Sequence, residues 1–149
     1  MAYCKMQKEQ ATPTVFFNAS VILAGLISPC GGSAKLLEWI KHGKISGFIS
    51  EIVLDEVSRH ANLVELSKES AVQKVQKIFT TISPAPYQST VKAYQHLVID
   101  YGDAHILASC QELKTNFLVT LDKKHLLVLQ EKVKTVKIVS PKQLIETLA

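Results

Sequence analysis

The sequence predicts an α/β protein, built as a three-layer α/β/α sandwich around a central parallel sheet. Short apolar runs typical of strands alternate with amphipathic segments of roughly 10–15 residues that are typical of helices. The runs TVFF at 14–17 and FLVT at 117–120 carry almost no polar side chains. Strands of this kind are buried on both faces, as they are when helices cover both sides of a parallel sheet.

The first predicted unit is a strand that leads directly into a helix. The strand at 14–17 is followed by an apolar stretch that ends at residue 27, with Asn18 or Ser20 as the helix cap. The sequence SPCGG at 28–32 then ends this helix, because Pro and Gly disfavour its continuation. A leader at 1–12, polar and without periodicity, is expected to be flexible, so the single domain is predicted over residues 13–149.

The remaining elements follow from helical spacing of apolar residues, from caps and from β-branched runs. In chain order, we expect a helix at 33–43, a strand at 48–49, a helix capped by Ser50 and ending near 61, and a helix at 68–81. A turn or extended edge segment at 83–86, a helix to about 98, a helix at 103–113, strands at 117–120 and 136–139, and a helix from Pro141 complete the domain.

The composition excludes several classes of protein. With 47% hydrophobic and 20% charged residues, the chain is neither collagen-like nor largely disordered. Three separated cysteines, Cys4, Cys30 and Cys110, argue against a disulfide framework and for a reducing, cytoplasmic setting. The longest apolar run, 21–27, is too short to cross a bilayer, so we expect no membrane association. A net charge of +4 is compatible with a polyanionic partner without requiring one.

Polar residues follow the predicted strands at the edge where ligands bind in open α/β sheets. Asn18 and Ser20 come after the first strand, and Glu56 lies in the helix after the second. Asp122 ends the strand at 117–120, and Asp103 lies in the first turn of the preceding helix. Each acid alone could cap a helix or shape a turn. Several carboxylates at one sheet edge repel one another unless cations lie between them, and Mg²⁺ or Mn²⁺ suits such oxygen ligands.

Two other features have simpler interpretations. The lone Trp39 lies at helical spacing from Leu36, which favours a place in the core or at a dimer interface over a base-stacking surface. Lys123, Lys124 and His125 follow Asp122 and could form either a cationic rim for RNA phosphates or a solvated loop.

Four short motifs occur in an order and spacing that resemble the PIN-domain family, in particular its VapC-like ribonuclease toxins. The family pattern is a strand ending in Asp-x-Asn/Ser, then Leu-x-Glu-Val, Asp-x-x-x-Leu-Ala and Leu-Val-Thr-x-Asp. The corresponding segments are FNASV at 17–21, LDEV at 54–57, DAHILA at 103–108 and LVTLD at 118–122. The resemblance extends from about residue 14 to the end of the chain.

This resemblance implies a PIN-like fold and a metal-dependent endoribonuclease that acts on single-stranded RNA. It also implies a toxin paired with a small antitoxin protein, and a homodimer. Glu56, Asp103 and Asp122 would be acidic ligands of Mg²⁺ or Mn²⁺, together with Asn18. Ser20 would orient the ligand at the end of the first strand and a metal-bound water.

One departure from the family pattern concerns the first acid, because Asn18 stands where the family has Asp. An amide offers a neutral oxygen and removes a full negative charge from the site. The chain is then either a naturally attenuated or repurposed member, or one in which Asn18 was introduced to inactivate a toxic nuclease. The alternative functions are a catalytically inactive PIN-fold module that binds RNA or a protein partner, and an α/β protein whose acids only cap helices.

Overall fold

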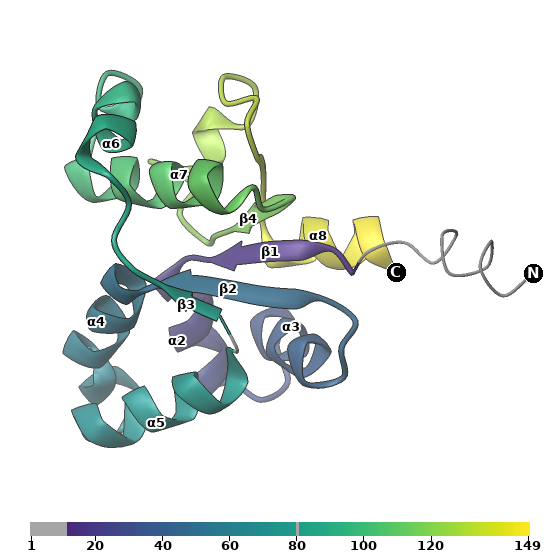
Figure 1. The fold of residues 1–149 in the computed structure, drawn as a ribbon. Coiled ribbons are helices and arrows are strands. Elements are labelled where there is room, and N and C mark those ends of the chain that lie inside the picture. The colour runs from purple at the N-terminus through teal and green to yellow at the C-terminus, as the bar shows by residue number, and fades with distance from the viewer. Residues whose placement is uncertain (1–11, 80) are drawn as a thin grey trace, which may run out of the picture.

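A parallel five-stranded sheet forms the centre of the computed structural model, which describes residues 12–79 and 81–149 (Figure 1). The strand order is β3-β2-β1-β4-β5, and all four neighbouring pairs are parallel. The strands are β1 (Thr14–Phe17), β2 (Ser46–Ser50), β3 (Thr81–Ser83), β4 (Phe117–Val119) and β5 (Lys137–Val139). This arrangement confirms the predicted fold class.

Helices lie on both sides of this sheet. In chain order they are α2 (Ala19–Ile27), α3 (Gly32–Lys41), α4 (Glu51–Arg59), α5 (Lys68–Ile78), α6 (Gln88–Tyr94), α7 (Tyr101–Leu113) and α8 (Pro141–Leu148). Two short 3₁₀ helices, η1 (Ala61–Val64) and η2 (Leu127–Leu129), lie in the connections. Helices α2 to α5 lie on one side of β1 and β2, and α6 and α7 lie on the other (Figure 1). Helix α8 packs against α3 and β5.

The central strand explains why its sequence is so apolar. β1 pairs with β2 on one side and with β4 on the other, so both of its faces are covered. Val15, Phe16 and Phe17 are fully buried, and the ring of Phe17 meets that of Phe79 edge-on at 5.2 Å. Burial of these side chains from both faces fixes the position at which β1 ends, and hence the position of Asn18.

The chain changes direction across the sheet at β1. From β1 it moves outward through β2 to β3, and then returns to the other side of β1 to form β4 and β5. The boundary between β1 and β4 is therefore a topological switch point, where α/β proteins form crevices at the carboxyl ends of their strands.

Two predicted helices end earlier than the sequence pattern indicated. The helix expected over 68–81 ends at Ile78, and Thr81–Ser83 forms the edge strand β3. Phe79 already has an extended backbone, and the β-branched Thr81 and Ile82 pair with β2. Pro84 also favours an extended residue before it. Helix α6 ends at Tyr94 and not near residue 98.

Trp39 is buried in the core, as its spacing predicted, and the Lys44 ammonium lies 4.1 Å from its ring centroid. Cys30 and Cys110 are both free thiols. Cys4 and nearly all of the predicted leader lie outside the described residues.

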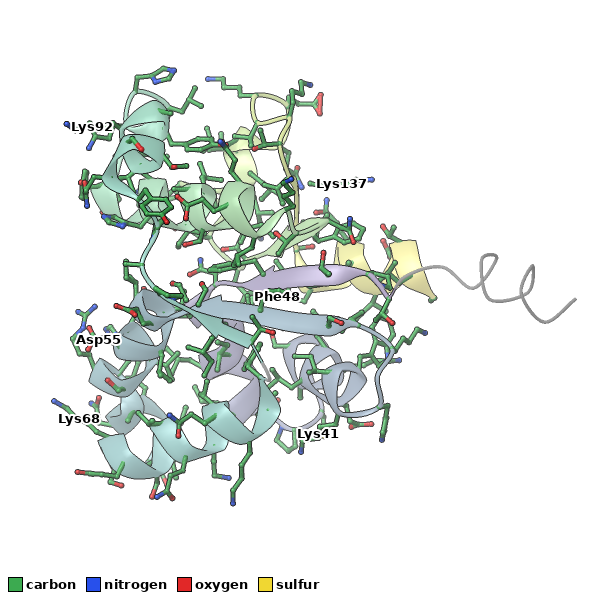
Figure 2. The ribbon with its side chains drawn as sticks, in the orientation of Figure 1. Lys41, Phe48, Asp55, Lys68, Lys92 and Lys137 are labelled. Carbon is green, nitrogen blue, oxygen red and sulfur yellow. The ribbon has the colours of Figure 1, made fainter. Side chains whose placement is uncertain are left out.

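Four lysines of the described residues lie on four different elements. Lys41, Lys68, Lys92 and Lys137 project from α3, α5, α6 and β5, around the periphery of the molecule (Figure 2). No single helix in the described part of the chain has the length and apolar composition to cross a membrane. The pair α2 and α3 meets those two criteria together but is bent by 97°.

Candidate metal centre

All five residues that the sequence singled out line one cleft of about 360 Å³ at the carboxyl ends of the strands. They are Asn18, Ser20, Glu56, Asp103 and Asp122. The cleft lies at the switch point between β1 and β4, where the fold itself favours a ligand site. Residues from four parts of the chain therefore converge there, as the reading of the strand ends predicted.

Asn18 is held by the ends of β1 and β4. It precedes α2, its backbone N–H donates to the Val119 carbonyl at 3.1 Å, and its side chain is 7% exposed. The side-chain Nδ2 donates to Thr120 Oγ1 at 2.7 Å. Because the amide nitrogen is engaged by Thr120, the amide oxygen is the atom that remains for a cation in the cleft.

Asp103 lies in the first turn of α7, but it is not the residue that caps this helix. That role belongs to Asp100, whose Oδ1 accepts a hydrogen bond from the Gly102 N–H at 3.0 Å. Asp103 is 8% exposed, and its Oδ2 is buried without a hydrogen-bond partner in residues 12–79 and 81–149. A buried carboxylate oxygen without a partner is costly unless a cation or proton is bound there.

The surroundings of Asp103 alter its acidity. Burial raises the pKa of this carboxyl to about 6, and the negative charges of Asp100, Asp122 and Glu56 add to the increase. His125 acts in the opposite direction and lowers the pKa. Crowded acids of this kind are expected where a bound cation balances their charge.

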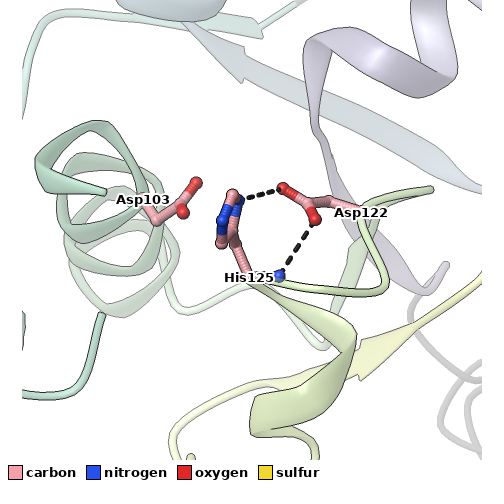
Figure 3. A group of neighbouring side chains, drawn as sticks. All are labelled: Asp103, Asp122 and His125. Carbon is pink, nitrogen blue, oxygen red and sulfur yellow. Dashed lines mark hydrogen bonds and ion pairs between the residues drawn. The ribbon is translucent and has the colours of Figure 1, made fainter. Parts of the chain in front are cut away.

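Asp122 shapes the turn after β4 while facing the cleft. Its Oδ1 accepts hydrogen bonds from the backbone N–H groups of Lys124 at 3.1 Å and His125 at 3.0 Å. Its Oδ2 lies 3.2 Å from Nδ1 of His125 (Figure 3). Its own N–H donates to Thr120 Oγ1 at 3.1 Å, so Thr120 connects Asn18 to Asp122. The turn-shaping interpretation of Asp122 is therefore confirmed, and the same residue lines the cleft.

Glu56 and Ser20 complete the cleft from the helices of the other layer. Glu56 is half-buried on α4 and lines the cleft with Ile52, one turn earlier, as their spacing predicted. Ser20 Oγ accepts a hydrogen bond from the Leu121 N–H at 3.3 Å, and so joins α2 to the segment after β4. The predicted orienting role of Ser20 toward Asn18 has no hydrogen bond to support it among the described residues.

His125 is the site residue that sequence reasoning underrated. Oxygens of Asp103 and Asp122 and a ring nitrogen of His125 lie within 4.8 Å of one another, close enough for one ion to contact all three (Figure 3). The unpartnered Oδ2 of Asp103 and this set of donors fit a divalent cation. The turn after Asp122 brings His125 next to Asp103 and Asp122, and that reversal was not evident from the sequence. Arg59 and His60 also line the cleft without having been predicted.

Comparisons with known proteins bear on the family and the fold of the chain. The family model described as PIN domain matches residues 14–124. The structure is similar to PAE2754 from Pyrobaculum aerophilum, with a TM-score of 0.61 and 20% sequence identity over 92% of this chain and 96% of that chain. It is also similar to VapBC2 from Rickettsia felis bound to a DNA fragment from its promoter, with a TM-score of 0.63 and 14% identity over 85% and 98% of the two chains. None of the curated proteins compared with the chain matches it significantly.

Proposed function

The chain belongs to the PIN domain family, and from that premise we propose that it is a metal-dependent endoribonuclease acting on single-stranded RNA, attenuated by Asn18. The observation that carries this proposal is the convergence of Asn18, Glu56, Asp103 and Asp122 on one cleft at the switch point of the sheet. A group of carboxylates with one unpartnered buried oxygen is suited to hold Mg²⁺ or Mn²⁺.

The residues of the cleft have separate tasks in this proposal. Asp103, Asp122 and Glu56 would hold the cation, with the Asn18 oxygen as a neutral ligand. When bound, a divalent cation supplies charge neutralisation at the scissile phosphate and lowers the pKa of water. Thr120 keeps Asn18 and the Asp122 backbone in register through its two hydrogen bonds. Ser20 fixes the adjoining segment through Leu121.

Asn18 also supports a second candidate, a PIN-fold module that binds RNA or a protein partner without cleaving it. A neutral amide at the end of β1 leaves one fewer negative charge for the cation than a carboxylate would. The two candidates differ in whether the remaining carboxylates are sufficient for hydrolysis.

The test restores the missing charge. Asn18→Asp is nearly isosteric, and the Thr120 hydroxyl can rotate to donate to the new carboxylate while still accepting from the Asp122 N–H. We expect Asn18→Asp to cleave a fluorescently labelled single-stranded RNA about 10²–10³-fold faster than the parent with Mg²⁺ or Mn²⁺, because an ionic ligand adds several kcal/mol of charge stabilisation.

Adding Asp103→Asn to this variant should abolish the gain, and a chelator should stop cleavage by every variant. Equal cleavage by parent and Asn18→Asp with both metals would contradict a place for position 18 in the reaction. Absence of cleavage by either protein, with RNA still bound, would favour the binding module.

We further propose a small antitoxin protein as a partner, since the fold is shared with VapBC2, and a homodimer as the state in solution. Trp39, whose position in the sequence would also suit a dimer interface, is buried and offers little contact area. Light scattering at high micromolar concentration checks the dimer directly. A mass of one chain throughout that range would rule it out.

A further inference from the structure

We propose that His125 is a ligand of the bound cation together with Asp103 and Asp122, and that its nitrogen makes the site select a first-row transition ion over Mg²⁺. This inference rests on the proposed function in one respect, because it takes the bound cation to be the one that the proposed nuclease would use. It concerns which cation binds, and it can be measured without RNA.

The first step is the geometry of the three side chains. The imidazole of His125 lies between the carboxylates of Asp103 and Asp122 (Figure 3). One donor atom from each residue lies within 4.8 Å of the other two. Donor atoms on opposite sides of one octahedral ion are separated by about 4.2 Å, from metal–oxygen and metal–nitrogen distances of about 2.1 Å. A single ion can therefore reach all three with small side-chain rotations.

The second step is an independent sign that a ligand is needed there. Asp103 is more than nine-tenths buried, and its Oδ2 has no hydrogen-bond partner in residues 12–79 and 81–149. Figure 3 shows the Asp103 carboxylate directed toward the ring of His125. Oδ1 of Asp122 is engaged by the turn, whereas its Oδ2 contacts only the imidazole among the described residues. The position for a cation is therefore between the Asp103 carboxylate, Asp122 Oδ2 and the imidazole.

The third step is the state of the imidazole itself. His125 is held at both its backbone and its ring, because its N–H donates to Asp122 Oδ1 at 3.0 Å and its Nδ1 lies 3.2 Å from Asp122 Oδ2. Two neighbouring ligands of an octahedral ion are about 3.0 Å apart, from bond lengths of about 2.1 Å. Nδ1 of His125 and Oδ2 of Asp122 are close to that separation, so one cation between them can take both atoms as ligands in place of the hydrogen bond.

The fourth step is the choice of ion. Mg²⁺ binds oxygen ligands and gives up its water reluctantly. Transition ions accept imidazole nitrogen more readily, and the affinity of a given site is higher for Co²⁺ than for Mn²⁺. Asn18 supplies a neutral oxygen, so the cleft attracts a hard cation less strongly than a set of four carboxylates would. With less charge in the site, the nitrogen ligand has a larger share in deciding which ion is bound.

The test measures binding of Co²⁺ and of Mg²⁺ to the full chain by calorimetry, in the parent and in His125→Gln. The glutamine keeps the backbone hydrogen bond to Asp122 but removes the imidazole. We expect His125→Gln to weaken Co²⁺ binding by at least about tenfold and Mg²⁺ binding by less than about twofold. The matched control is His96→Gln, an exposed histidine after α6, which should change neither affinity.

Pulsed electron paramagnetic resonance with Mn²⁺ adds a direct view of the ligand. The parent should show coupling from one directly bound imidazole nitrogen, and His125→Gln should lose it. His60→Gln should retain it, although His60 also lines the cleft. The melting temperature of His125→Gln in chelator, if close to that of the parent, shows that the variant is folded.

Equal weakening of Co²⁺ and Mg²⁺ by His125→Gln, an unchanged Co²⁺ affinity, or absence of nitrogen coupling in the parent would each overturn the inference. Its failure is separable from that of the proposed function. RNA cleavage with Mg²⁺ alongside an unaltered His125→Gln affinity refutes only the ligand assignment. Selective Co²⁺ binding without RNA cleavage by Asn18→Asp refutes only the nuclease.

Discussion

Asp103 shows how a single carboxylate can both destabilise a fold and prepare it for a ligand. The side chain is buried at the start of α7 with one oxygen unpartnered, and its neighbours include three other acids. In the absence of a cation these features favour the protonated form of the carboxyl. The free energy that the fold loses here is recovered when a cation binds, because binding to the native state alone stabilises it.

This arrangement predicts a pH dependence for the stability of the metal-free protein. The pKa of Asp103 is raised from 3.8 to about 6 on folding, so the native state holds this proton more tightly than the unfolded chain. The free energy of unfolding should therefore fall as pH rises from about 4 to about 6, and stay lowered above that.

Asp103→Asn removes this effect. At pH 7–8 in chelator, the variant should melt roughly 2–6 °C higher than the parent, and the difference should vanish toward pH 4. Scanning calorimetry over this range measures it. Asp55→Asn, on the exposed side of α4, is the control and should shift the melting temperature little. A parent that is less stable than Asp103→Asn at pH 4, or equally stable at pH 8, would contradict the prediction.

The stability of Asn18→Asp relative to the parent should change sign when metal is added. In chelator the new carboxylate adds negative charge close to Asp103 and Asp122, so the variant should melt below the parent. With Mn²⁺ in excess, the same carboxylate is an ionic ligand, and the variant should gain more in melting temperature than the parent does. Thermal melts of both proteins with and without Mn²⁺ decide this. Equal gains would place the position 18 side chain outside the metal site.

At the scale of the elements, strands and caps were predictable because they depend on local sequence. The apolar run of β1 and the Ser50 cap of α4 formed as expected. Helix α8 begins at Pro141, as predicted, behind a capping box of Ser140 and Gln143. β3 was predicted only in part, as an extended edge segment that begins at Ser83, because Thr81 continues the helical pattern of α5 and joins the strand by pairing with β2. Tertiary pairing overrode the local preference there.

The candidate site divides in the same way. The positions of Glu56 and Asp122 at the cleft were predictable from local sequence. Glu56 shares a helix face with Ile52, and Asp122 follows the strand β4. His125 was not, because its direction depends on a turn that the two Asp122 hydrogen bonds close. Arg59 and His60 reach the cleft only through the last turn of α4.

The packing between β2 and its covering helix gives a prediction for this element. A Cβ at Gly47 would lie 2.4 Å from Ile40 Cδ1 and 3.0 Å from Phe79 Cδ1. Gly47→Ala should therefore destabilise the protein by about 1–3 kcal/mol, because two core side chains must move. Gly32→Ala is the control. Gly32 is the first residue of α3, and the nearest atom to a Cβ there would be Ile145 Cδ1, at an ordinary contact distance of 3.5 Å. Urea unfolding compares the two, and an unchanged midpoint for Gly47→Ala would contradict the packing.

At the scale of the whole molecule, the distribution of charge bears on how RNA would be held. The chain has 17 Lys and Arg against 13 Asp and Glu, and the four lysines labelled in Figure 2 lie on four separate elements. Near the cleft the candidates for phosphate contacts are few: Arg59 lines it, and Lys123 and Lys124 directly follow Asp122. Binding should be weak and should depend only modestly on salt.

The last prediction measures this with RNA binding by Asp103→Asn, a variant that should not cleave. The logarithm of affinity for single-stranded RNA should fall with the logarithm of salt concentration with a slope of about −1 to −2, since each phosphate contact contributes about −0.7. Replacing both Lys123 and Lys124 by Gln should reduce the slope by about 1.4 units, because two counterions are no longer released. Replacing Lys41 and Lys68, which project from α3 and α5, removes the same charge and should leave the slope unchanged. If both pairs reduce the slope equally, RNA follows the overall charge of the molecule and not the rim of the cleft.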